Sequence, residues 1–232
     1  MYSRFMQVVA IAALLVCGVF GTTVSSAQNN MGSADFDADR YNLNAQLLTV
    51  AKRGDAERVR ALLDRGAAID SRNRNGETAL MLFTKNGDAI MSGELIGRGA
   101  SVDLAAVNGT TPLMAAAFGG HAGIAALLLD AGAAPAAKDQ LRKTAMVYAA
   151  GAGHTDVVVL LIGRGLSVDA RYEHDLTALM WAAGYGNTET VRLLLDHGAD
   201  ATARDDRGKT ALDIAIDGKH PATVSVLKAA AH

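Results

Sequence analysis

Few residues of this chain stand in combinations that could perform chemistry. Gly208-Lys209-Thr210 is similar to the end of a phosphate-binding loop, in which backbone amides and a lysine surround phosphate oxygens. That loop requires a glycine five residues before Gly208, where this chain has Ala203. Neither Gly97-Arg98-Gly99 nor Gly163-Arg164-Gly165 is followed by the third glycine of a dinucleotide-binding loop. The sequence therefore argues against a nucleotide site.

Histidine is the other residue type that suggests chemistry, and the chain has six. His121, His154 and His220 are separated by 33 residues or a multiple of 33, so stacked repeats would hold neighbouring histidines about 8–10 Å apart. Two nitrogens that share a zinc ion each lie ~2 Å from it, so these histidines fit a zinc site poorly. No spacing unites a serine, a histidine and a carboxylate as in a nucleophilic enzyme. We expect no metal, no cofactor and no catalytic residue, and only His174 is available for binding a partner.

The amino-acid composition excludes further classes of protein. The chain has 232 residues, of which 50% are hydrophobic but only 5% aromatic, so its core must be built from small aliphatic side chains. A net charge of −2 argues against a nucleic-acid-binding protein, which needs a clustered basic surface. The single cysteine, Cys17, excludes a disulfide framework.

Residues 1–27 differ from the rest of the chain. Arg4 is their only charge, an apolar run extends from Val8 to Phe20, and the small residues Ser25 and Ala27 follow. This pattern is typical of a secretory signal peptide, and we expect cleavage between Ala27 and Gln28. The apolar run is shorter than the ~18–20 residues of a membrane span, so no stable membrane insertion is expected after cleavage. The alternative is a retained membrane anchor. Residues 28–39 are polar and predict a linker.

The rest of the chain is organised by a period of 33 residues. Threonine recurs with this spacing at Thr78, Thr111, Thr144, Thr177 and Thr210. Two glycine series have the same spacing, one at Gly54, Gly87, Gly120, Gly153 and Gly186 and the other at Gly66, Gly99, Gly132, Gly165 and Gly198. Three series with one common period identify internal repeats.

Each period predicts two short helices. The threonine hydroxyl can cap the first helix, and the mid-repeat glycine ends it. Asp55, Asp88 and Asn187 follow such glycines and are expected to cap the second helix. That helix has large aliphatic residues three or four apart, such as Val158 and Leu161, which predicts one apolar face. Helices of about two turns are unstable alone, so each repeat must be held by its neighbours, as in a solenoid.

The stretch from Thr111 to Ala133, which begins TPLMAAAFGGH and ends LLLDAGA, resembles the ankyrin repeat. The resemblance covers residues 40–232 and implies an all-α solenoid of helix–turn–helix units joined by β-hairpin loops. It also implies a structural role for the histidines at the turn between two helices. We expect six repeats, at 40–72, 73–105, 106–138, 139–171, 172–204 and 205–232, of which the first and last are caps.

The tips of the hairpin loops vary in sequence. Gly76, Gly109 and Gly208 occupy one tip position, where Arg142 and Asp175 replace glycine in the other two repeats. We therefore expect these two tips to differ in shape from the rest. The charges of the tips nearly cancel, so they predict no one-signed field for nucleic acid or anionic lipid.

Four of the few aromatic residues lie on or just after predicted first helices, which line the concave side of ankyrin domains. They are Phe118, Tyr148, Trp181 and Tyr185. Aromatic residues dominate the binding energy of many protein interfaces, although Trp181 also fits a half-buried structural role. The remaining expected contact residues lie on neighbouring tips and are Leu141, Lys143, Glu173, His174 and Arg207.

These features together predict a non-catalytic protein–protein interaction module. We expect a monomer, periplasmic or secreted, whose concave groove and hairpin tips bind another exported protein and inhibit, hold or stabilise it. Two alternatives remain open at this point. One is a structural spacer anchored in a membrane by an uncleaved signal segment, and the other is a hydrolase built on the repeat scaffold, for which the sequence shows no acid–base pocket.

Overall fold

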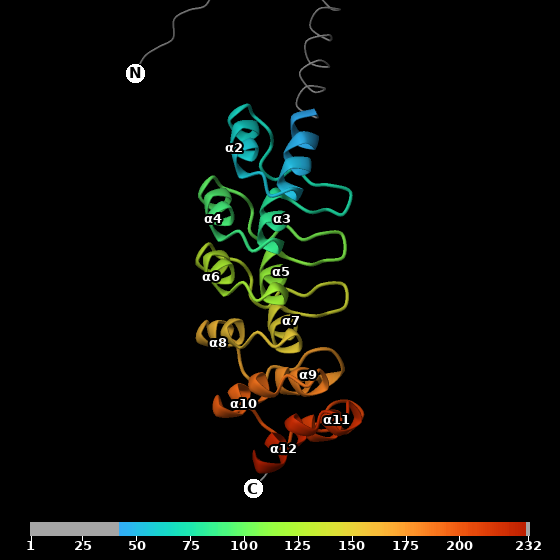
Figure 1. The fold of residues 1–232 in the computed structure, drawn as a ribbon. Helices are drawn as coiled ribbons and strands as arrows, with labels where there is room; N and C mark the ends of the chain where they lie inside the picture. The colour runs from blue at the N-terminus through green and yellow to red at the C-terminus, as the bar shows by residue number, and fades with distance from the viewer. Residues whose placement is uncertain (1–41, 231–232) are drawn as a thin grey trace, which may run out of the picture. The chain divides into compact units, whose positions relative to one another are not determined.

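The computed structural model describes residues 42–230 (Figure 1). The chain divides into two units, Met1–Asp39 and Arg40–His232, and the description below concerns the second. The expected signal peptide at 1–27, its cleavage site between Ala27 and Gln28, and the linker at 28–39 all lie outside the described residues.

The described residues form helix pairs that follow one another along the chain, and no strand occurs among them. The fold is therefore an all-α repeat solenoid, as expected. A helix over residues 42–52 comes first. The later helices are α2 (Ala56–Asp64), α3 (Ala79–Lys85), α4 (Ala89–Gly97), α5 (Pro112–Gly119), α6 (Ala122–Asp130), α7 (Ala145–Ala152), α8 (Thr155–Gly163), α9 (Ala178–Gly184), α10 (Thr188–Asp196), α11 (Ala211–Asp217) and α12 (Pro221–Ala230), with a short 3₁₀ turn η1 (Glu173–Asp175) before α9.

Successive repeats stack helix against helix. The first helices α3, α5, α7, α9 and α11 pack on one another in chain order, and the second helices from α4 to α12 do the same. In Figure 1 the second helices α2, α4, α6 and α8 form one column, and the loops project from the opposite side of the first helices. The surface made by the first helices and the loop tips is called the groove face below. None of the helices in the described residues is long and apolar enough to cross a bilayer.

Alanine pairs allow the first helices to approach closely. Ala116 and Ala117 of α5, Ala149 and Ala150 of α7, and Ala182 and Ala183 of α9 are all fully buried. Leu and Val side chains of the second helices, such as Leu128 and Leu161, complete the core on the other side. Phe83 is the one aromatic side chain in the buried core of the described residues, which fits the scarcity of aromatic residues in the sequence.

Threonine begins five of the first helices. The hydroxyl oxygens of these threonines accept hydrogen bonds from the backbone N–H three residues later, at 3.2–3.5 Å, and the expected caps are confirmed at Thr78, Thr111, Thr144, Thr177 and Thr210. Asp55 and Asp88 cap second helices in the same way, with distances of 3.1 and 2.9 Å to the amides of Arg58 and Met91.

The expected cap at Asn187 is wrong, since its side chain makes no capping bond to α10. Its Nδ2 instead donates to the carbonyl oxygens of Ala150 at 3.0 Å and Gly151 at 2.8 Å, in the preceding repeat. The last carbonyls of a helix lack partners within the helix, and the carboxamide satisfies two of them at the end of α7. Asn187 therefore stands at the N-cap position of α10, but its side chain joins two repeats instead of capping the helix.

Histidine makes the same inter-repeat connection at the equivalent positions. The Nε2 atom of His154 lies 2.9 Å from the carbonyl oxygen of Phe118, and that of His220 lies 3.0 Å from the carbonyl oxygen of Gly184. Each ring reaches back from the start of a second helix to the end of the preceding first helix. The structural role expected for these two histidines is confirmed.

These rings also explain one glycine series. Gly120 has a φ of +71°, and a Cβ built on it would lie only 2.5 Å from Nδ1 of His154. The position therefore requires glycine twice, for its left-handed backbone and for the space that the imidazole occupies. In the last repeat Lys219 adopts a φ of 57° at the equivalent position.

The expectation that the tips at Arg142 and Asp175 differ in shape from the others is correct for only one of the two. Arg142 adopts a φ of 54°, and its turn is closed by the same two backbone hydrogen bonds as the turn at Gly76. The N–H of Arg142 donates to Asp139 and that of Asp139 to Lys143, as Gly76 donates to Asn73 and Asn73 to Glu77. The expected difference at Arg142 is therefore wrong. The tip at Asp175 does differ: His174 and Asp175 both have left-handed φ values, of 57° and 56°, and residues 173–175 form η1.

We predict that two glycine-to-alanine variants have opposite effects on stability. Gly93 lies inside α4, and an added Cβ would make an ordinary 3.5 Å contact with Cδ1 of Leu127. Gly93→Ala should raise the free energy of unfolding by about 0.5–1 kcal/mol, because alanine favours the helix. Gly120→Ala should lower it by about 1 kcal/mol or more, because of its positive φ and the His154 ring. Urea unfolding of both variants measures this, and a neutral or stabilising Gly120→Ala would contradict the account of the glycine series.

Candidate functional site

The structure brings the four predicted aromatic residues together as two pairs on the groove face. Phe118 at the end of α5 and Tyr148 of α7 meet edge to face, with ring centroids 6.0 Å apart and an interplanar angle of 85°. Trp181 of α9 and Tyr185, which follows α9, are stacked at 6.2 Å and 13°. Both geometries are favourable for aromatic rings. Phe118 is 64% exposed and Tyr185 59% exposed, whereas Tyr148 and Trp181 are partly buried.

Lys143 connects the two pairs. It lies at the end of the tip before α7, and its Nζ is 5.8 Å from the ring centroid of Tyr148 and 5.0 Å from that of Trp181. Both distances are within the range of a cation–π interaction. Tyr148 and Trp181 occupy equivalent positions in successive repeats, so one ammonium group contacts the rings of two repeats. These five residues, Phe118, Lys143, Tyr148, Trp181 and Tyr185, are called the aromatic cluster.

Two shallow hollows adjoin the aromatic cluster. The larger, of about 440 Å³, is lined by Lys85, Thr110, Met114, Ala115, Phe118, Gly119 and Tyr148. The smaller, of about 130 Å³, is lined by Phe118, Lys143, Val147, Tyr148, Gly151, Ala152, Trp181 and Tyr185. The two share Phe118 and Tyr148, so they are neighbours on the groove face. Leu141, which is 66% exposed on the tip between α6 and α7, lines neither hollow.

Asp139 fixes the tip and the ring of Tyr148 at once. Its Oδ1 accepts hydrogen bonds from the backbone amides of Leu141 at 2.9 Å and Lys143 at 2.8 Å. Its Oδ2 accepts the phenolic hydrogen of Tyr148 at 2.5 Å. Burial, followed by this carboxylate neighbour, raises the pKa of Tyr148 to about 12. Asp139 therefore holds both the backbone of Lys143 and the ring of Tyr148 in place.

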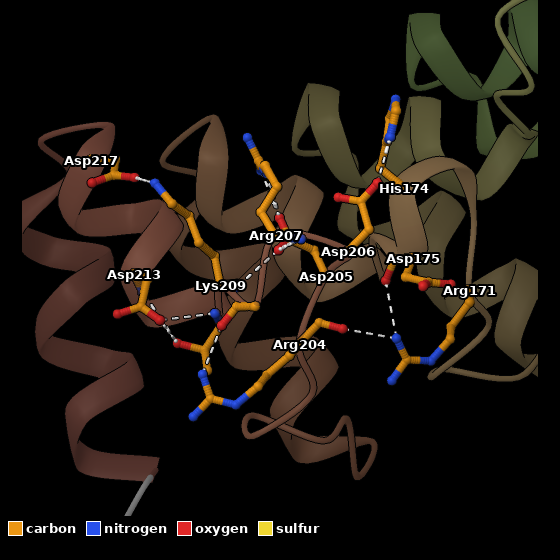
Figure 2. A network of polar contacts seen from close by, with 12 residues as sticks. Arg171, His174, Asp175, Arg204, Asp205, Asp206, Arg207, Lys209, Asp213 and Asp217 are labelled. Atoms are coloured by element: carbon orange, nitrogen blue, oxygen red, sulfur yellow. Dashed lines mark hydrogen bonds and ion pairs between the residues drawn. The ribbon is translucent and has the colours of Figure 1, made fainter.

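The three other predicted contact residues, Glu173, His174 and Arg207, lie elsewhere, on the tips at 172–176 and 205–209. Figure 2 shows His174 and Arg207. Glu173 faces Arg142 of the preceding tip, with Nε and Oε2 3.0 Å apart. The Nδ1 atom of His174 lies 2.7 Å from Oδ2 of Asp206 on the following tip. His174 is exposed, as expected of a residue available to a partner, but it already has an acidic neighbour.

Arg207 is bound to its own tip. Its Nη2 and Nε donate to Oδ2 of Asp205 at 2.6 and 3.0 Å. Burial alone would raise the pKa of Asp205, but the hydrogen bonds from Arg207 and from the amide of Lys209 outweigh it and lower the pKa. Arg171 continues this network by donating to the carbonyl oxygen of Arg204 at 2.9 Å (Figure 2). Glu173 and His174 therefore connect neighbouring tips, whereas Arg207 stabilises its own tip, and all three are separate from the aromatic cluster.

Sequence reasoning missed Lys85 and Met114, which line the larger hollow. Lys85 lies one repeat before Phe118 at the equivalent position, and Met114 is equivalent to Met81 and Met180. The period could therefore have pointed to both, but the sequence reasoning followed aromatic residues and tip residues only. The sequence predicts no metal site at the histidines. In the part of the chain that the structure describes, no three or more potential metal ligands lie together.

Stacked helix pairs, protruding tips and a largely preformed surface together define the class of protein: a helical repeat scaffold. The family model for ankyrin repeats (3 copies) matches residues 47–139, 93–172 and 146–232, and the chain belongs to the ankyrin-repeat family. Ankyrin repeats are in general non-catalytic protein–protein interaction modules. Comparison with curated proteins gives no match.

We predict that Tyr148 ionises late in a pH titration. Because its folded-state pKa of about 12 lies above the ordinary value of 10, its contribution to stability is complete below pH 10 and is lost as the pH rises through about 12. Ring NMR signals of the tyrosines should show one midpoint near pH 12 that disappears in Tyr148→Phe. Tyr172→Phe is the control, because burial also raises the pKa of Tyr172. A Tyr148 midpoint at pH 10 would contradict the bond to Asp139.

Proposed function

We propose that the protein is an exported binding module that holds a partner protein on its groove face, centred on the aromatic cluster. The observation that carries this proposal is the exposure of Phe118 and Tyr185, beside two hollows, in a chain with few aromatic residues. Aromatic side chains contribute most of the binding energy at many interfaces, and here they lie next to one another on successive repeats.

The rigidity of the surface supports the same function. Asp139 holds the tip and Tyr148, and His154 and Asn187 fix the ends of the helices that carry Phe118 and Tyr148. A surface that is already ordered loses little conformational entropy when a partner binds. The protein would then bind a folded partner without rearrangement, and such binding could inhibit, hold or stabilise that partner.

Features of the first 27 residues support export of the protein. Arg4, the apolar run from Val8 to Phe20 and the small residues before Gln28 form the pattern of a cleaved signal peptide. Cys17 is the single cysteine of the chain and lies before the expected cleavage site. A mature chain without cysteine is well suited to an oxidising compartment such as the periplasm or the cell exterior. The partner is then another exported protein.

We predict that truncating the exposed rings abolishes partner binding. In affinity capture from the exported fraction, the wild-type protein should retain a specific partner that Phe118→Ala/Tyr185→Ala loses. With the purified partner, each single variant should weaken binding by about thirtyfold, the effect of losing about 2 kcal/mol at an interface hot spot.

Ile90→Ala is the matched control for this experiment, because Ile90 is 80% exposed but lies on the second helix α4, away from the groove face. Circular dichroism and thermal unfolding must show that all variants stay folded. Retention of the partner by the double variant, or its loss in Ile90→Ala, would refute the groove assignment. Glu173→Ala and His174→Ala are measured as a separate set of variants, because each change also breaks a contact between two tips.

We predict that the protein isolated from the exported fraction begins at Gln28. Intact-mass measurement and N-terminal sequencing should show loss of residues 1–27, because Ser25 and Ala27 fit the small side-chain positions before a cleavage site. A mass that includes residues 1–27, recovered with membranes, would instead indicate a membrane-anchored spacer.

A further inference from the structure

We propose that the partner segment bound by the aromatic cluster is acidic, with a carboxylate against Lys143 and a neighbouring apolar side chain in the larger hollow beside Phe118. This inference rests on the proposed function and specifies the chemistry of the partner. It depends on the charges that the groove face presents, which the residue count of the sequence does not show.

Within the described residues, the charged side chains that line the two hollows at the aromatic cluster are lysines. Lys85 lines the larger hollow beside Phe118 and Lys143 lines the smaller one. A third hollow, of about 1000 Å³ between the helix at 42–52 and the first tip, has the basic lining residues Lys52, Arg53, Arg72 and Arg74. Lys85 is paired with Glu77, but Lys143 and the basic residues of the third hollow form no ion pair among the described residues, so the groove face presents positive charge in its first and fourth repeats.

Two carboxylates close to these lysines in the sequence, Glu77 and Asp139, form hydrogen bonds or ion pairs within the protein. Glu77 is bound by Lys85 and Asn73 and is largely buried. Asp139 accepts the hydroxyl of Tyr148 and two backbone amides and is also buried. Lys143 forms no ion pair within the described residues, and its charge is stabilised by the faces of two aromatic rings. An ammonium group held in this way can still donate a charge-assisted hydrogen bond to a carboxylate.

The larger hollow sets the second requirement. Besides Lys85, its lining includes the apolar residues Met114, Ala115 and Phe118 and the ring of Tyr148. Such a surface takes an aliphatic or aromatic side chain, and it adjoins the smaller hollow at which Lys143 lies. A segment that bears an acidic residue next to an apolar one satisfies both hollows together.

The charges at the C-terminal end of the solenoid indicate in which direction the partner segment runs along the groove face. The tips at 172–176 and 205–209 carry basic as well as acidic residues, and their bases Arg207 and Lys209 are already paired with Asp205 and Asp217. Toward the N-terminal repeats the hollows are lined by Lys85, Lys52 and Arg53. The segment therefore extends from Lys143 toward the first repeat.

Selection of short random peptides on the immobilised full chain tests the proposal. We expect enrichment of peptides that contain Asp or Glu beside Phe, Leu or Trp. Fluorescence of Trp181, the only tryptophan of the chain, should change when a tryptophan-free synthetic version of an enriched peptide binds. Replacing its acidic residues by Asn or Gln should weaken binding about tenfold, and added salt should weaken the binding of the acidic peptide.

Variants of Lys143 separate a binding role from a purely structural one. Lys143→Gln should lose the preference for acidic peptides while staying folded, and Lys143→Arg should keep it, because arginine retains the charge and also stacks on aromatic rings. Lys228→Gln on α12 is the matched control and should behave as wild type. Enrichment of neutral or basic peptides, no enrichment, or an acidic preference unchanged in Lys143→Gln would overturn the proposal.

The failure of this inference differs from the failure of the proposed function. A captured partner that is lost on truncating Phe118 and Tyr185 but is insensitive to Lys143→Gln would leave the groove assignment standing and refute the acidic segment. A partner that tolerates all three changes would refute both.

Discussion

The helices of this protein are too short to be stable alone, and this limit governs the whole structure. Each of the helices from α2 to α12 has seven to ten residues, whereas isolated helices are marginal below ~12–15 residues. Every repeat therefore depends on contacts with the next one. Buried alanine pairs let the first helices approach, and side chains at the start of the second helices bind carbonyls of the preceding repeat, as His154 and Asn187 do. A repeat that lost its neighbours would lose these bonds as well as its core.

The same contacts position the candidate site. Because α7 and α9 pack directly on each other, Tyr148 and Trp181 project from equivalent places on neighbouring helices. Lys143 reaches both rings from a tip that Asp139 holds in place. The aromatic cluster is therefore assembled from residues of three repeats, and no single repeat could form it. Changes that loosen the interface between α7 and α9 should act on the cluster even where they touch none of its members.

The sequence predicts what repeats with the period and misses what occurs once. Threonine caps and helix-ending glycines recur, so backbone chemistry identifies them, and the resemblance to ankyrin repeats identifies the histidine connections. Asn187 was misassigned because capping and inter-repeat bonding use the same residue type at the same position, and only the orientation of the carboxamide separates them. Arg142 was misassigned because a left-handed φ is tolerated there by a residue other than glycine. The contact of Lys143 with two rings depends on side-chain reach between repeats, which spacing does not encode.

The charge of the groove face shows why a residue count is a poor guide to a binding surface. The acidic and basic residues of the tips nearly balance in number, yet they are not equivalent in the fold. Asp70, Asp103 and Asp169 each accept a backbone amide of the next repeat, at 3.0, 3.0 and 2.8 Å. A carboxylate suits this task because it only accepts hydrogen bonds, and the amides at a repeat boundary only donate. A lysine side chain cannot make that bond because its ammonium group only donates, and Lys143 keeps its charge without an ion pair among the described residues. A solenoid that joins its repeats through aspartate can thus keep a lysine such as Lys143 on its groove face even when its overall charge is slightly negative.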